Sequence, residues 1–123
     1  MQGERNSGLE INEKMQPFTT ALDNRMEMSR FKIEECKTMS SKKVPLWITC
    51  ANSEDGAEDI QIMFKVGDDL RQDKMTLQIV RIMDKIWLDN GLDLRMSPYQ
   101  VVATKDQEGM IEIVQNSTTT EYI

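Results

Sequence analysis

The chain has 123 residues, a formal net charge of -6 and 39% apolar residues. This length suits one compact domain that buries roughly two thirds of the surface of its unfolded chain. No segment approaches the roughly 18 consecutive apolar residues of a membrane-spanning helix, and the composition is typical of a soluble globular protein. The acidic balance argues against a general nucleic-acid-binding surface, which would need a basic face.

Cysteine and histidine usage narrows the chemistry further. Cys36 and Cys50 lack the C-x-x-C spacing of common metal sites, and the chain contains no histidine. The usual zinc motifs and histidine-based catalysis are therefore excluded. Because the N-terminus has no apolar signal sequence, we expect both thiols to be reduced in a cytosolic setting and packed as small apolar groups.

The N-terminal part is polar and lacks periodicity, so residues 1–28 are interpreted as a mobile arm that leads into the domain. Apolar and polar residues alternate around Phe31 and Ile33, which predicts a first strand before a polar turn at residues 39–44. A second strand is predicted over residues 46–50, where one face is apolar.

A third strand and the turn that follows it concentrate charge. Alternation over residues 60–65 predicts a half-buried strand that ends at Lys65. Gly67 permits a sharp turn, and Asp69 and Gln72 have the spacing of a helix capping box. A lysine at the end of a strand, followed by carboxylates where a helix begins, suits the binding of nucleotide phosphates. A polar turn without a binding role has the same pattern.

The second half of the chain reads as one helix and two strands. The helix begins near residue 70, carries apolar residues at helical spacing and ends at Asn90-Gly91. Strands are predicted over residues 99–104 and 110–114, joined as a hairpin. The predicted order is therefore three strands, a helix and two strands.

The C-terminal end has its own signal. Thr118 and Glu121 have the spacing of a capping box, yet the sequence stops at Ile123. We therefore interpret residues 116–123 as the start of a hinge or helix that is truncated. A frayed polar tail fits the same residues.

Several motifs resemble the catalytic domain of phosphoinositide 3-kinases. The most specific is FKVGDDLRQD at residues 64–73. Shorter similar runs follow it, namely Leu77-Gln78-Ile79, Ile82-Met83, Ile86-Trp87 and residues 91–96. Upstream, residues 36–43 and 45–47 resemble the phosphate-covering loop and the second strand of class I members. Downstream, residues 98–99 and 110–114 resemble the pair of strands that leads to the interlobe hinge. The similarity runs from about residue 31 to residue 120.

The resemblance implies a fold and a subclass. It implies an α+β fold similar to a protein-kinase small lobe, with a five-stranded antiparallel sheet and one long helix after the third strand. This lobe is expected over residues 29–115. Pro45-Leu46-Trp47 favours class I, whereas residues 99–104 are more similar to a phosphatidylinositol 4-kinase and residues 63–67 also to class II enzymes.

The resemblance also implies how ATP phosphates would be held. Lys65 is similar to the lysine that contacts the phosphates, and Asp68 and Asp73 to the acidic residues that orient it and shape the inner pocket. Ser41 and Lys42 would lie over the phosphates. The chemistry fits, because phosphoryl transfer depends on positioning and charge stabilisation, and a nearby carboxylate keeps a lysine charged and in place.

An adenine pocket is implied in the same way. Its lining is expected from Met39, Pro45, Trp47, Met63, Tyr99 and Ile111, and the backbone of Glu112 and Val114 would hydrogen-bond the adenine edge. Nucleotide sites are commonly apolar with few polar anchors. By periodicity alone, Met63, Tyr99 and Ile111 fit a protein core equally well, and Lys42 fits a solvated turn.

The expected function is that of a lipid kinase, which transfers the γ-phosphate of ATP to the inositol ring of a membrane phosphoinositide. The resemblance places the Mg²⁺ ligands and the lipid-reading loop in a second lobe beyond Ile123, so this chain is expected to hold no metal and to be inactive alone. It also implies a cytoplasmic enzyme that is recruited peripherally to membranes, and a regulatory subunit as a partner. The alternatives are a fragment of a phosphatidylinositol 4-kinase, a non-catalytic interaction module, or an adaptor unrelated to nucleotides.

Overall fold

The computed structural model describes residues 16–40 and 42–122. The strands are β1 (Phe18–Thr19), β2 (Glu27–Phe31), β3 (Lys37–Thr38), β4 (Leu46–Asn52), β5 (Ile60–Val66), β6 (Val101–Lys105) and β7 (Glu108–Glu112). The helices are α2 (Arg71–Asp89) and two short 3-10 turns, η1 (Ile33–Glu35) and η2 (Thr120–Tyr122). The expected α+β class, with one antiparallel sheet and one long helix, is observed.

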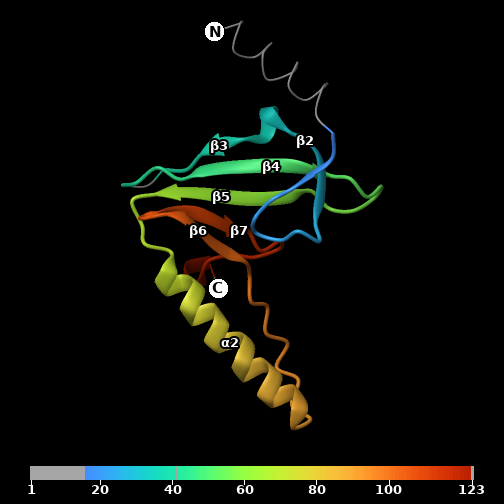
Figure 1. The fold of residues 1–123 in the computed structure, drawn as a ribbon, viewed down its shortest axis with the longest axis vertical. Coiled ribbons are helices and arrows are strands. Elements are labelled where there is room, and N and C mark those ends of the chain that lie inside the picture. The colour runs from blue at the N-terminus through green and yellow to red at the C-terminus, as the bar shows by residue number, and fades with distance from the viewer. Residues whose placement is uncertain (1–15, 41, 123) are drawn as a thin grey trace, which may run out of the picture.

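The described strands form a single antiparallel sheet in the order β1-β2-β4-β5-β7-β6 (Figure 1). The short strand β3 pairs with the first residues of β4, on the same side of β4 as β2. The sheet has seven strands where five were expected, because β1 and β3 are two-residue strands that alternation over longer windows does not detect. The helix α2 follows β5, which is the third of the strands longer than two residues.

The first predicted strand is wrong in its second half. β2 ends at Phe31, and the chain then turns through η1, closed by hydrogen bonds from the Glu35 N–H to the Lys32 carbonyl (3.0 Å) and from the Cys36 N–H to the Ile33 carbonyl (3.2 Å). Ile33 is exposed rather than inward-facing. The alternation at this point therefore reflects a turn and not a longer strand.

Residues assigned by sequence to an N-terminal arm belong to the sheet and the core. Of the predicted arm, residues 1–15 lie outside the described residues. Leu22 and Met28 are buried, and the Phe18 ring packs 5.2 Å from the ring of Phe31. Polar residues alternate irregularly with the apolar ones in this segment, so the sequence shows no clear strand pattern there. The segment is held in the core because its strand β2 pairs with β4.

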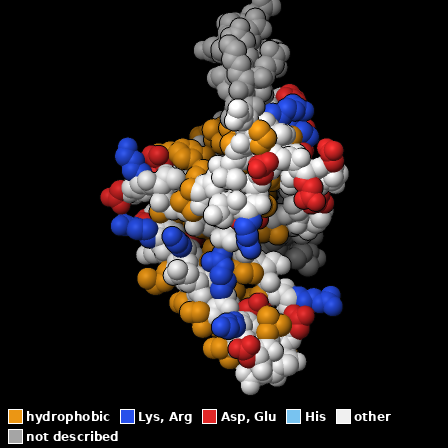
Figure 2. Space-filling view, turned by 45° about the vertical axis from the view of Figure 1, so that its right-hand side comes forward, with side chains coloured by type: hydrophobic (Ala, Val, Ile, Leu, Met, Phe, Trp, Pro, Cys, Tyr) orange, Lys and Arg blue, Asp and Glu red, His pale blue; other side chains and the backbone are white. Residues whose placement is uncertain are grey.

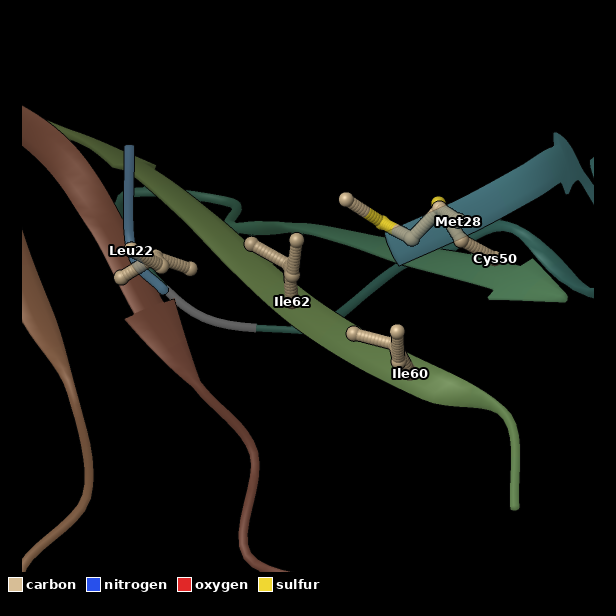
Figure 3. Packing of buried hydrophobic residues seen from close by; sticks show 5 residues of the cluster. All are labelled: Leu22, Met28, Cys50, Ile60 and Ile62. Carbon is tan, nitrogen blue, oxygen red and sulfur yellow. The ribbon is translucent and has the colours of Figure 1, made fainter. Parts of the chain in front are cut away.

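Two apolar clusters lie on opposite faces of the sheet. Figure 3 shows the first, which consists of Leu22, Met28, Cys50, Ile60 and Ile62. The second consists of Leu70, Leu77 and Val101, with Tyr99 and Ile111 packed against it. Because Val101 pairs with Ile111 and Ile111 with Met63, this second face also carries the odd-numbered side chains of β5. The start of α2 thus covers only part of that face.

The helix α2 begins without the predicted capping box. Leu70 is its N-cap residue and no side chain caps it. The Asp69 carboxylate instead accepts hydrogen bonds from the backbone N–H and the guanidinium of Arg71. Beyond its contact with β6, α2 projects away from the sheet (Figure 1). No helix in the described part of the chain is both long and apolar enough to cross a bilayer.

Candidate functional site

Lys65 lies near the end of β5, directly opposite Gly109 of β7. A Cβ atom on Gly109 would come within 2.3 Å of the Val102 carbonyl oxygen and 2.6 Å of Leu70 Cδ1. Glycine therefore allows β6, β7 and the start of α2 to pack closely beside Lys65. This packing fixes the strand end from which the Lys65 side chain extends.

The turn after β5 brings a carboxylate back to Lys65. Gly67 has a φ of 99°, and its N–H donates a hydrogen bond to the Gln107 carbonyl (2.6 Å). Asp68 then lies with Oδ2 3.0 Å from Lys65 Nζ and Oδ1 3.1 Å from Lys43 Nζ. Lys43 Nζ also donates a hydrogen bond to the Gly67 carbonyl. Two ammonium groups thus share one carboxylate.

The electrostatics of this group favour the ionised form of Asp68. Hydrogen bonds from Lys65, and then from Lys43, lower the pKa of the Asp68 carboxyl below its ordinary value. Asp73, which sequence placed beside Lys65, lies in the first turn of α2 as an exposed residue, and no ion pair joins it to Lys65 in the described part of the chain. Asp68 alone therefore takes the position of counter-ion to Lys65.

The loop before β4 and the end of β5 enclose an open hollow of about 440 Å³. It is lined by Met39, Ser40, Lys42, Lys43, Pro45, Met63, Lys65 and Asp68. The Met39 N–H donates a hydrogen bond to the Pro45 carbonyl (3.0 Å), which closes the loop at its base. Six residues singled out from sequence meet here, whereas Ser41 lies outside the described residues. The hollow combines apolar walls with three lysines at its rim.

An apolar row continues from the hollow along the same face of the sheet. Trp47 pairs with Met63, and Met63 pairs with Ile111, so the three side chains are neighbours across β4, β5 and β7. Lys37 Nζ lies 5.0 Å from the centre of the Trp47 ring, at cation–π distance. Tyr99 lies further on, packed with Ile111 in the cluster beneath α2. The row therefore links the hollow to the core under the helix.

Glu112 and Val114 lie at and beyond the end of β7, away from the lysines of the hollow. The Glu112 N–H donates to the Gln100 carbonyl (2.9 Å), and the Glu112 carboxylate accepts from the Gln100 N–H (2.9 Å). The Val114 carbonyl accepts a hydrogen bond from the Ser117 hydroxyl (2.7 Å). These contacts fix the backbone where the chain leaves the sheet.

Lys43 is the site residue that sequence reasoning missed. Two adjacent lysines in a polar turn give no indication of which one faces the strand end. The one signal in the sequence was their position just before Pro45, in the loop that closes over a lysine-bearing strand. With Lys43 included, the hollow presents neighbouring ammonium groups beside the apolar side chains of Met39, Pro45 and Met63. This combination suits a polyphosphate joined to a flat apolar group.

Comparison with known proteins identifies the family of this chain. The sequence model of the family described as phosphatidylinositol 3- and 4-kinase matches residues 59–123, which are more than half of the chain. The chain is 50% identical over 102 residues to phosphatidylinositol 3-kinase 2 of Dictyostelium discoideum, and 48% identical over 106 residues to phosphatidylinositol 3-kinase 1 of the same organism. These alignments cover 83% and 86% of this chain.

A third relative, phosphatidylinositol 3-kinase 3 of Dictyostelium discoideum, is 49% identical over 90 residues, or 73% of this chain. The chain spans only 6%, 7% and 5% of the lengths of phosphatidylinositol 3-kinases 2, 1 and 3. The likeness thus concerns one segment of much longer proteins, and that segment contains the strand end, the turn and α2. By the family match over residues 59–123, this chain belongs to the phosphatidylinositol 3- and 4-kinase family.

Proposed function

We propose that this chain supplies the ATP-binding small lobe, similar to that of a protein kinase, of a phosphatidylinositol 3-kinase. The observation that carries the proposal is the position of Lys65, at the end of β5 and at the rim of a hollow with an apolar floor. The names of the relatives support the 3-kinase assignment. The enzyme would transfer the γ-phosphate of ATP to the inositol ring of a membrane phosphoinositide.

In this proposal the two ends of the site bind two parts of the nucleotide. Lys65 would stabilise negative charge on the phosphates, with the loop that contains Lys42 above them. The row that contains Trp47 and Met63 would contact the adenine face. The backbone of Val114 would provide a hydrogen bond to the adenine edge, since no backbone partner is found for its N–H within the described residues.

Mg²⁺, which kinases use to neutralise developing phosphate charge, would be held elsewhere in the parent protein. The described residues contain no cluster of three potential metal-ligating side chains. The proposal therefore assigns nucleotide binding to this chain and assigns metal binding and lipid recognition to the rest of the enzyme. The chain alone would bind ATP without turnover.

The proposed lipid substrate also bears on where the parent enzyme would act. A phosphoinositide lies in a bilayer, so the parent enzyme would be cytoplasmic and recruited to a membrane surface. A regulatory subunit would be one means of recruitment. Both statements are extensions of the proposed activity.

The test is ATP binding by the 123-residue chain with Lys65→Met. In a Trp87→Phe background Trp47 is the single tryptophan, and its fluorescence reports on the proposed adenine face. Methionine keeps the apolar stem but removes the charge, so we expect ATP affinity to fall about tenfold or more. Lys74→Met, on exposed α2 outside the hollow, is the matched control.

Equal affinity in the Lys65→Met variant, or no binding by the unsubstituted chain, would contradict the proposal. An assay with phosphatidylinositol vesicles and radiolabelled ATP tests the second part. Lipid phosphorylation above that of the Lys65→Met variant would show that the chain does not need the rest of the enzyme.

A further inference from the structure

We propose that Asp68 is an internal counter-anion, which pairs with two lysines of the site and is displaced from them when the phosphates of a nucleotide bind. The group of Lys43, Asp68 and Lys65 is called the carboxylate bridge below. The inference rests on the proposed nucleotide-binding function and deepens it. It assigns to Asp68 a role opposite to that of a fixed support for Lys65.

The geometry gives each carboxylate oxygen its own cation. Asp68 Oδ1 lies 3.1 Å from Lys43 Nζ, and Asp68 Oδ2 lies 3.0 Å from Lys65 Nζ. The three side chains come from the loop before β4, from β5 and from the turn after it. Phosphate oxygens are acceptors of the same kind as carboxylate oxygens, and a triphosphate carries more charge and more of them.

The exposure of these groups makes the exchange feasible. The side chains of Lys43, Asp68 and Lys65 are 52%, 37% and 29% exposed. Ion pairs at such positions contribute little to stability because water screens them. A polyanion that reaches both lysines at once can therefore replace the carboxylate without disrupting the core.

Displacement would also change how the loop is held. The Lys43 ammonium donates to the Gly67 carbonyl, and its aliphatic stem lies so close that a Cβ on Gly67 would be 3.0 Å from Lys43 Cδ. Lys43 thus ties the loop before β4 to the turn after β5. When phosphate takes Lys43, this tie is exchanged for one through the ligand, so binding of phosphate and movement of the loop are coupled.

The sign of one substitution separates the two roles of Asp68. If Asp68 only orients Lys65, Asp68→Asn weakens ATP binding. If it competes with phosphate, Asp68→Asn strengthens binding, by about twofold to fivefold for partly exposed pairs of this kind. The measurement is a titration of the 123-residue chain with ATP and, separately, with inorganic tripolyphosphate at fixed ionic strength.

Asp69→Asn is the matched control. It removes the same charge one residue away, but Asp69 pairs with Arg71 and does not line the hollow. We expect this variant to bind ATP with the affinity of the unsubstituted chain. Unchanged or weaker binding by Asp68→Asn would overturn the inference, and so would equal strengthening by both variants, which would indicate a general effect of charge.

A second readout does not depend on nucleotide affinity. Carboxyl NMR of Asp68 should show a lowered pKa in the free chain that rises when tripolyphosphate is added. An unmoved pKa at saturating tripolyphosphate, or no binding of tripolyphosphate, overturns the carboxylate bridge as an exchange site. If the pKa of Asp68 rises but Lys65→Met leaves ATP affinity unchanged, the exchange of Asp68 for phosphate is supported. The proposal that the hollow binds ATP is then refuted.

Discussion

At the scale of single residues, Gly109 shapes the site, because its lack of a side chain lets the strands and α2 meet beside Lys65. A methyl group there would lie 2.3 Å from a backbone oxygen of Val102 and 2.6 Å from Leu70 Cδ1. The backbone atom cannot rotate away, so the strands must separate. We expect Gly109→Ala to lower the free energy of unfolding by about 1–3 kcal/mol in urea titrations followed by circular dichroism.

Gly56→Ala is the control for Gly109→Ala, because it introduces backbone strain without overpacking. Gly56 has a φ of 79°, and a Cβ atom added to it would have nothing within 4 Å, so alanine there meets only the cost of the left-handed conformation, about 1 kcal/mol. ATP affinity distinguishes the two variants further. Gly109→Ala should also weaken ATP binding, whereas Gly56→Ala should not. Equal losses of stability with unchanged ATP affinity in both variants would refute the role given to Gly109.

At the scale of elements, α2 has two unlike parts. Leu77 is its single buried residue among those described, whereas Met75, Ile79, Ile82, Met83 and Ile86 are exposed. Figure 2 shows apolar side chains exposed along α2, interspersed with lysine and arginine. The apolar packing of the helix against the sheet is therefore concentrated in its first turns. Arg81 adds a polar anchor, because its guanidinium donates hydrogen bonds to the Tyr99 carbonyl (3.0 Å) and to Gln100 Oε1 (3.2 Å).

This anchoring predicts a contrast between two neighbouring apolar residues of α2. Leu77→Ala removes packing against Leu70 and Val101, and we expect it to cost about 2–4 kcal/mol of unfolding free energy. Ile79→Ala, two residues on and 52% exposed, should change stability by no more than about 0.5 kcal/mol. Both values come from the same urea titration. Similar costs for the two variants would mean that Ile79 is covered in solution.

The elements that sequence predicted well are those with long, regular patterns. Alternation located β4, β5 and the β6–β7 hairpin, and helical spacing located α2. Sequence could not locate β1 and β3, because two-residue strands exist only through their tertiary partners. The capping box failed for a similar reason, since the Asp69 carboxylate binds Arg71 instead.

Pairings between distant segments limited the prediction of the site. The motif around Lys65 identified the lysine and its acidic neighbours, but it left open which carboxylate contacts it. The structure selects Asp68 because the left-handed Gly67 turns the chain back on β5. The contact of Lys43 with Asp68 spans 25 residues and depends on how the loop folds over the strand end. No local pattern encodes that distance.

At the scale of the whole molecule, the two faces of the antiparallel sheet differ in what they carry. Its first face carries the larger apolar cluster, which holds the described N-terminal segment against β4 and β5. On its second face the start of α2 packs against β6, and the lysine-rimmed hollow lies beside it, at the end of β5. In the proposed function, the nucleotide would bind where the helix leaves the sheet face uncovered, and its phosphates would contact lysines that pair with Asp68 in the free chain.

This arrangement predicts how Mg²⁺ affects ATP binding by the 123-residue chain. Mg²⁺ bound to ATP neutralises part of the phosphate charge that the lysines attract, and the described residues hold no group of three potential metal ligands that would offset this loss. We expect free ATP, with a chelator present, to bind about threefold more tightly than the magnesium complex at equal ionic strength. Fluorescence titrations of Trp47 with and without Mg²⁺ measure this ratio. Tighter binding of the magnesium complex would mean that the chain supplies metal ligands of its own, and Asp68→Asn and Asp73→Asn would then show which carboxylate provides them.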